Sequence, residues 1–275
     1  MGVLVTILEW FNTKMTKPEM YGWFHLVWFA LSIAAGIFLC IRFKEGTEKQ
    51  ARGVILTVAI LVTVLEIYKQ IVYSVEYQNG VFVVDYPWYI FPWQFCSMPM
   101  YVGLLAGFTP KGKVHDAACA FLSSYAIFAG LCVMLYPVSV FTSTVGVNIQ
   151  TMVCHGSMLT VGIYLLYTGY VKSEHKTFLK ALPVFGAAIA VAIVMNEIAF
   201  RTGLLETDFF NMFYISPHAE PHLPVYSSVQ AVVPFPFCLF IYIAAFSLAA
   251  YLILLIPIAI KAISKRRARV AVAKA

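Results

Sequence analysis

The sequence predicts an all-α polytopic membrane helix bundle with seven transmembrane helices. Hydrophobic residues make up 61% of the 275 residues and charged residues only 12%, whereas a soluble domain carries about 25% charged residues. Seven stretches approach or exceed the roughly 20 apolar residues that a membrane-crossing helix needs. In chain order they are residues 21–43, 53–75, 92–108, 115–136, 148–171, 179–201 and 235–260, of which the third is the shortest.

The chain divides into three parts around these stretches. Residues 1–19 combine an apolar run with charged residues, including Glu9, Lys14 and Lys17, which predicts an interfacial N-terminal segment. Residues 20–261 form the seven-helix membrane domain, and residues 262–275 form a basic cytoplasmic tail.

The basic residues predict the orientation, because Lys and Arg are retained on the cytoplasmic side of a membrane protein. Fifteen of the nineteen lie in alternate connections, after the first, third, fifth and seventh stretches. Only Lys14, Lys17 and Arg201 lie on the opposite side, and Lys69 lies inside a stretch. We therefore expect an external N-terminus and a cytoplasmic C-terminus, in a multi-pass protein of the cell membrane, with a bacterial plasma membrane as its setting.

Composition argues against several classes of function. The net charge of +6 is explained by basic residues beside anionic lipid headgroups, so no nucleic acid is expected as a partner. The six cysteines form no C-x-x-C pair, so neither a disulfide framework nor a metal site is predicted. The seventh stretch has no lysine before Lys261, which disfavours a retinal protein, and no cofactor is expected.

Polar residues gather in the half of the bundle that this orientation makes external. Intramembrane ionisable residues are costly unless they pair or face a cavity, so they indicate a functional site by default. Helical spacing places them on single faces of four helices. They are Glu66, Lys69, Gln94, Cys96, Asn148, His155, Asn196, Glu197 and Arg201. The external connections, Tyr77 to Phe91 and Thr202 to Val233, are long and aromatic, which fits either lids over a site or an aromatic belt at the interface.

Cys96 and His155 are the candidates for covalent chemistry. Cys96 begins a helix beside Gln94 and Ser97, where the helix dipole and free N–H groups stabilise a thiolate. His155 shares a helix face with Asn148 and Thr151. A cysteine with a nearby histidine is a nucleophile and its base. On composition alone, buried hydrogen bonding between helices is the commoner explanation of such residues.

The segments Trp93-Gln94-Phe95-Cys96-Ser97 and Val153-Cys154-His155-Gly156 resemble the YwaF-like family of bacterial integral membrane proteins, over most of residues 20–260. That family is similar to a eukaryotic transmembrane acyltransferase that moves acyl chains between phospholipids through a cysteine acyl intermediate. More distantly it looks like the androgen-induced hydrolases of fatty-acid esters, whose nucleophile is a threonine. The resemblance implies that Cys96 is the nucleophile and His155 the base, acting on a membrane phospholipid or other acyl lipid. Many YwaF-like members have His where this chain has Gln94.

The remaining polar residues have supporting roles in this hypothesis. Gln94, Asn148 or Asn196 would donate a hydrogen bond to the oxyanion, Glu66 or Glu197 would orient the imidazole, and Lys69 or Arg201 would bind a lipid phosphate. Structural ion pairs, Glu66 with Lys69 and Glu197 with Arg201, are the alternative reading of these charges. Two other functions stay open: a proton-coupled small-molecule transporter and a seven-helix binding or sensor protein.

Overall fold

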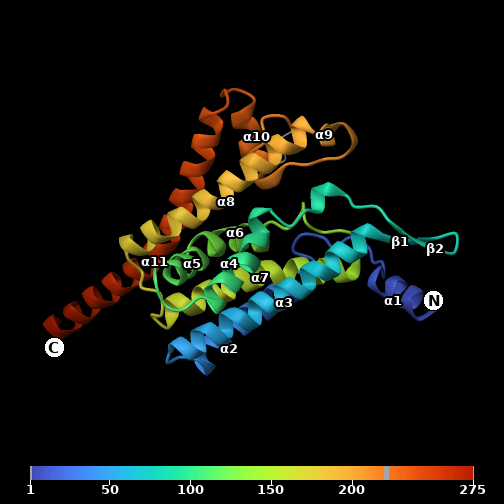
Figure 1. The fold of residues 1–275 in the computed structure, drawn as a ribbon. Coiled ribbons are helices and arrows are strands. Elements are labelled where there is room, and N and C mark those ends of the chain that lie inside the picture. The colour runs from blue at the N-terminus through green and yellow to red at the C-terminus, as the bar shows by residue number, and fades with distance from the viewer. Residues whose placement is uncertain (1, 220–222, 275) are drawn as a thin grey trace.

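The computed structural model describes residues 2–219 and 223–274. Eleven α-helices and one β-hairpin are present in this part of the chain (Figure 1). The helices are α1 Gly2–Phe11, α2 Trp23–Arg42, α3 Glu48–Ser74, α4 Met98–Phe108, α5 Lys113–Leu122, α6 Tyr125–Leu135, α7 Val145–Tyr167, α8 His175–Arg201, α9 Leu204–Thr207, α10 Pro224–Gln230 and α11 Phe237–Lys274. Three short 3₁₀ helices are η1 Trp88–Ile90, η2 Phe95–Ser97 and η3 Met212–Tyr214, and the strands are β1 Val75–Gln78 and β2 Val81–Val84.

Six helical segments are long and apolar enough to cross a membrane among the described residues, so the chain is a multi-pass helical membrane protein. They are Trp23–Arg42, Glu48–Ser74, Lys113–Leu135, Val145–Tyr167, His175–Arg201 and Phe237–Ser264. The third stretch expected from the sequence, 92–108, is shorter, because η2 and α4 form a helix only over Phe95–Phe108. The segment Lys113–Leu135 is interrupted between α5 and α6, and α11 continues as helix through the expected tail to Lys274.

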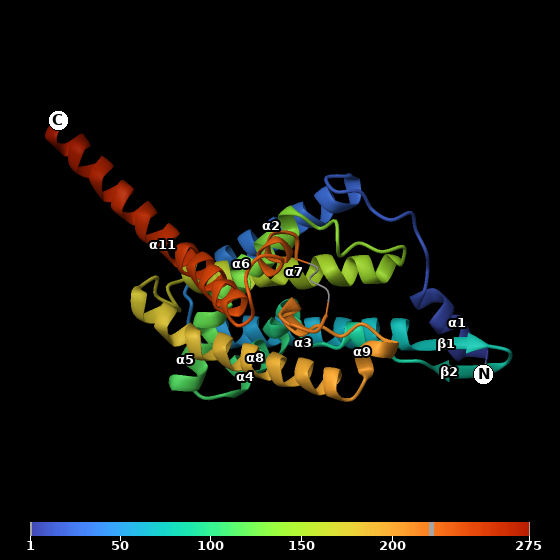
Figure 2. The ribbon, with the colours of Figure 1, turned by 90° about the horizontal axis from the view of Figure 1, so that it is seen from above.

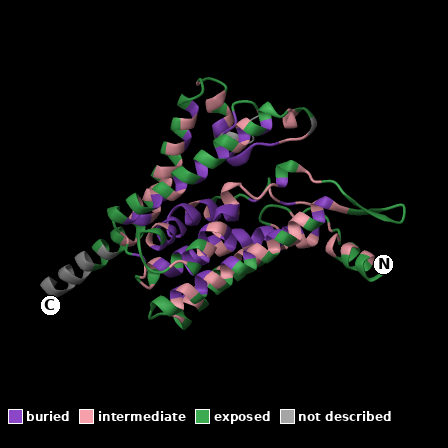
Figure 3. Cartoon of the chain, in the orientation of Figure 1, coloured by how far each residue is buried: buried purple, intermediate pink, exposed green. Residues whose placement is uncertain are grey.

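Helix α7 lies at the centre of the bundle and contacts α2, α3, α5 and α6. Within the 18-residue apolar stretch of α7, 72% of the residues are buried, whereas the corresponding stretches of α2, α3, α8 and α11 are only 17–28% buried. The exposed apolar faces of these four helices suit contact with lipid. Figure 3 shows this concentration of buried residues in the middle helices. Gly130 of α6 allows this packing, because a Cβ there would lie 2.7 Å from the backbone oxygen of His155.

The strands β1 and β2 form an antiparallel hairpin that the helical reading of the sequence did not predict. Val75 pairs with Val84 and Gln78 with Val81. The turn residues Asn79 and Gly80 both have positive φ, as a two-residue hairpin turn with the right-handed twist of the strands requires. Figures 1 and 2 show the hairpin and α1 at one end of the bundle, here called the hairpin end, with the C-terminus of α11 at the other.

Candidate functional site

A cavity of about 350 Å³ lies between α3, η2, α4 and α7, near the hairpin end. The 3₁₀ helix η1 and the loop before α7 complete its wall with Tyr89, Ile90, Ser139, Val140 and Thr142. Four of the nine residues singled out in the sequence line this cavity: Glu66, Lys69, Cys96 and His155. The structure therefore brings the candidate thiol and the candidate imidazole to the wall of one cavity, although 59 positions separate them in the sequence.

The hydrogen bonding of His155 leaves one ring nitrogen available. Nδ1 lies 2.7 Å from the backbone oxygen of Thr151, one turn earlier in α7. A carbonyl oxygen can only accept, so Nδ1 carries the proton and Nε2 carries the lone pair. Nε2 is buried and has no hydrogen-bond partner among the described residues. A buried polar atom without a partner is costly, and here it belongs to a side chain on the cavity wall.

Cys96 is held in the first turn of the Phe95–Phe108 helix by its neighbours. The ring of Phe95 packs against four aromatic rings, with centroids 5.3–6.2 Å away, which belong to Phe121, Phe185, Phe213 and Phe246. Trp93 donates its ring N–H to the backbone oxygen of Ala188 at 3.2 Å. The helix therefore starts at a fixed place, and Cys96 lies in its first turn.

The ion pair of Glu66 with Lys69 lies on the cavity wall. Lys69 Nζ is 2.8 Å from Glu66 Oε1, and Glu66 also accepts hydrogen bonds from Gln70 at 2.7 Å and from Gln150 at 3.3 Å. These donors stabilise a carboxylate that is only 6% exposed. Tyr86 donates to Gln70 Oε1 at 2.7 Å; burial and the Glu66 charge raise the pKa of Tyr86 to about 12, so it remains a donor. Glu66 thus fixes Lys69 at the cavity.

The three amides named as oxyanion donors do not line the cavity. Gln94 donates to the oxygen of Asn211 and accepts from the N–H of Phe213, both at 2.9 Å. Asn196 donates to the oxygen of Met212 and accepts from its N–H, at 3.0 and 2.7 Å. Asn148 makes the same double contact with Thr142, at 2.8 and 2.9 Å. Each amide side chain donates to and accepts from the backbone, as another peptide group would. Gln94 and Asn196 both bind the same buried turn, 211–213.

Glu197 and Arg201 form a separate pair at the end of α8, away from the cavity wall. Arg201 donates to Glu197 at 2.7 Å, and the two side chains are 75% and 40% exposed. His218 Nε2 lies 3.1 Å from the other Glu197 oxygen, and its ring stacks on Phe200. Glu197 and Arg201 therefore form the structural ion pair that the sequence left open as the alternative to a role in the site.

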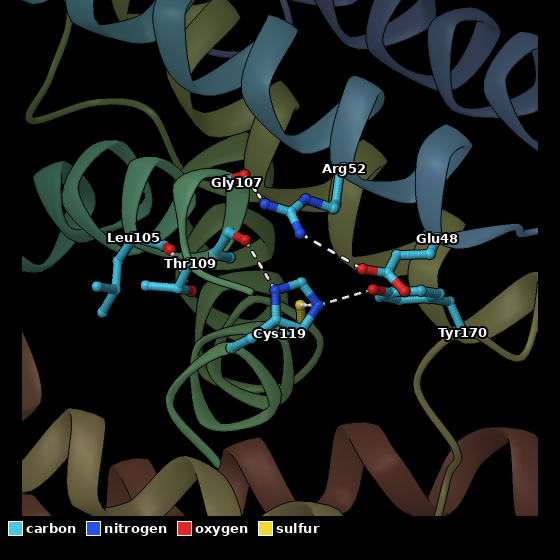
Figure 4. Close-up of polar contacts among 9 residues, drawn as sticks. Glu48, Arg52, Leu105, Gly107, Thr109, Cys119 and Tyr170 are labelled. Carbon is cyan, nitrogen blue, oxygen red and sulfur yellow. Dashed lines mark hydrogen bonds and ion pairs between the residues drawn. The ribbon is translucent and has the colours of Figure 1, made fainter. Parts of the chain in front are cut away.

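Two cysteine contacts were missed in the sequence. Cys154 lines the same cavity as Cys96 and accepts a hydrogen bond from Gln150 at 3.4 Å. On α5, Cys119 lies 3.5 Å from Nε2 of His115. Figure 4 shows Cys119 among Arg52, Glu48 and Tyr170. In the sequence, the i, i+4 spacing of His115 and Cys119 indicates that the two side chains are neighbours on one helix.

His115, which contacts Cys119, differs from His155 in the hydrogen bonding of its ring nitrogens. Nδ1 of His115 lies 2.8 Å from the oxygen of Ala106, and Nε2 lies 2.7 Å from the hydroxyl of Tyr170. Both nitrogens are therefore engaged, and the residue is 1% exposed. His115 joins the end of α4 to the loop after α7, whereas His155 keeps a free nitrogen at a cavity.

Comparison with known proteins gives a single positive result. No curated protein and no solved structure matches the chain. The sequence profile of the TMEM164 family matches residues 20–258, which includes every transmembrane candidate except the end of the last, and all residues that line the cavity. The chain belongs to the TMEM164 family of membrane proteins.

Proposed function

We propose that this protein is a membrane acyl-transfer enzyme in which Cys96 is the nucleophile and His155 the base. The observation that carries the proposal is that both side chains line one cavity while Nε2 of His155 has no partner in the described part of the chain. A nucleophile and an unengaged base at one cavity are what cysteine-dependent acyl transfer needs.

In the first half-reaction, Nε2 of His155 takes the proton from the Cys96 thiol. The thiolate attacks the carbonyl carbon of a lipid ester, which forms the C–S bond and places negative charge on the carbonyl oxygen. When the intermediate collapses, the C–O bond breaks, and the protonated imidazole gives its proton to the leaving alkoxide. The products are a thioester on Cys96 and a lysolipid.

In the second half-reaction, Nε2 takes a proton from an acceptor hydroxyl. The acceptor oxygen attacks the thioester carbonyl, the C–S bond breaks, and the imidazole returns the proton to the sulfur. With a lysolipid as acceptor the enzyme is a transacylase, and with water it is a lipase. General base catalysis of this kind contributes about 10²–10⁴ to the rate.

Two other cavity residues have roles in the proposal. Ser97 follows Cys96 directly and lines the same cavity, so its hydroxyl is our candidate for the oxyanion donor in place of the three amides; one good donor is worth about 3 kcal/mol. Lys69 uses one of its three donors on Glu66. Its other two are suited to the phosphate of a phospholipid headgroup.

The setting that we propose is the plasma membrane of a bacterium, with the chain as a YwaF-like member of its family. The resemblance of residues 93–97 and 153–156 to that family supports the assignment. The asymmetry of Lys and Arg supports an external N-terminus. In that orientation Phe95–Phe108 is the seventh, short membrane helix, and the cavity opens toward the outer leaflet.

The proposed function is tested by intact-mass measurement of the purified protein after exposure to mixed phospholipid vesicles. We expect a mass increase of one acyl chain that hydroxylamine removes, since hydroxylamine cleaves a thioester. Peptide mapping should place the acyl group on Cys96. An unmodified protein that nevertheless moves a solute or protons across the vesicle membrane would favour the transporter alternative.

The orientation is tested by labelling whole cells with an impermeant maleimide. In a background without native cysteines, Val81→Cys in the hairpin should be labelled and Lys111→Cys between α4 and α5 should not, because the basic connections are retained inside. Both positions are exposed. Labelling of position 111 alone would reverse the topology.

A further inference from the structure

The cavity changes character along the bundle. Toward the hairpin end its wall includes Lys69, Tyr73 and Thr142, and toward the opposite end it includes Val62 and Met100, which cluster with Cys154. The last three are 5%, 7% and 6% exposed and pack together in one apolar cluster. On α3, Val62 lies about one helical turn beyond Glu66. Val62 and Met100 are here called the floor, because they lie about 6 Å, or four helical rises of 1.5 Å, beyond Glu66 and Cys96 on their helices.

A second void of about 20 Å³ lies on the far side of the floor. Val62 borders both voids. The wall of the smaller void is built largely from small and apolar side chains of the same three helices, among them Ala59, Gly103 and Ser157. There α3 and α4 approach closely, since a Cβ on Gly103 would lie 2.9 Å from that of Ala59. The smaller void therefore lies beyond the cavity along the same helices, and the floor separates the two.

We propose that Val62 and Met100 determine the length of the acyl chain that Cys96 accepts. This inference rests on the proposed function. An acyl chain attached to Cys96 gains free energy by leaving water, at about 0.8 kcal/mol for each buried CH₂ group, so its tail extends to the apolar end of the cavity. There the floor stops it. A shorter side chain at position 62, which borders both voids, joins them, and a shorter side chain at position 100 deepens the cavity itself, so either change lets a longer chain enter.

The test compares acyl adducts of different length on the full-length protein in detergent micelles. The probes are the p-nitrophenyl esters of octanoic, lauric and palmitic acid, and intact mass gives the amount of each adduct on Cys96. Val62→Ala and Met100→Ala should each raise the ratio of palmitoyl to octanoyl adduct about tenfold, which is the lower range for one methylene group in an apolar pocket. Val62→Phe should lower it.

Val54→Ala is the matched control. Val54 lies on the same helix and is as buried as Val62, at 5% exposure, but it lines neither void. Its ratio should equal that of the wild type. Wild-type ratios in both Val62→Ala and Met100→Ala, with Cys96 acylated, would overturn the role of the floor and leave acyl transfer intact. An equal shift in Val54→Ala would also overturn it. If no ester acylates wild-type Cys96, the proposed function itself fails.

Discussion

Replacement of Cys96 by alanine is expected to abolish both formation of the acyl-enzyme and lipid turnover, a loss of at least about 10³-fold. Alanine has no atom that can attack an ester. The other thiol at the cavity, Cys154, lies in the middle of α7 and is hydrogen-bonded to Gln150, so it lacks the position that Cys96 has in the first turn of a helix. Cys96→Ser should retain a trace, because an alkoxide forms less readily in the same geometry.

The measurement is the release of lysolipid together with the hydroxylamine-sensitive mass increase. Cys154→Ala is the control, since it removes a thiol from the same cavity and should leave turnover near the wild-type level. Full turnover by Cys96→Ala would contradict the mechanism, and so would an acyl group mapped to Cys154.

Replacement of His155 by alanine is expected to slow both half-reactions by about 10²–10⁴-fold at neutral pH. Without the base, the thiol loses its proton to hydroxide, and the thiolate fraction rises about tenfold for each pH unit until the thiol is ionised. Raising the pH should therefore partly restore acylation in His155→Ala.

Single-turnover acylation at two pH values measures this effect. His115→Ala is the matched control, because it removes a buried histidine from the other contact with a cysteine. It should lower the unfolding temperature, since Ala106 and Tyr170 lose their partner, but it should preserve the rate for each folded molecule. A His155→Ala protein that acylates at the wild-type rate at both pH values would exclude His155 as the base.

The membrane character of the chain could be predicted because it depends on long apolar stretches alone. The start of the third helix could not. Gln94 looks like a helical residue, but its side chain holds the backbone at Asn211 and Phe213, 117 and 119 positions away, and its own backbone is extended. The hairpin has a local sequence signal, because Asn79-Gly80 between Val75–Gln78 and Val81–Val84 is typical of a two-residue turn, but the apolar helical pattern before it extends to residue 75 and hides the first strand.

The candidate site shows the same limit. Helical spacing identifies residues that share a face, and Asn148 and His155 both lie on α7 at such a spacing. It does not identify the partner of each side chain. An amide that clamps a loop, such as Asn148 on Thr142, has the same spacing as a residue that faces a cavity, so only the fold separates Gln94, Asn148 and Asn196 from Glu66 and Lys69.

The turn at 211–213 has a consequence for the order in which the protein matures. Gln94, two positions before Cys96, bonds to this turn, and Asn196 of α8 fixes it from the other side. Synthesis proceeds from the N-terminus, and early segments fold first. The ribosome therefore completes α3, α4 and α7 well before residues 211–213 exist. During that interval the backbone before Cys96 lacks these hydrogen bonds, and a truncated product that ends in α8 carries the thiol and the imidazole without the turn that holds Gln94.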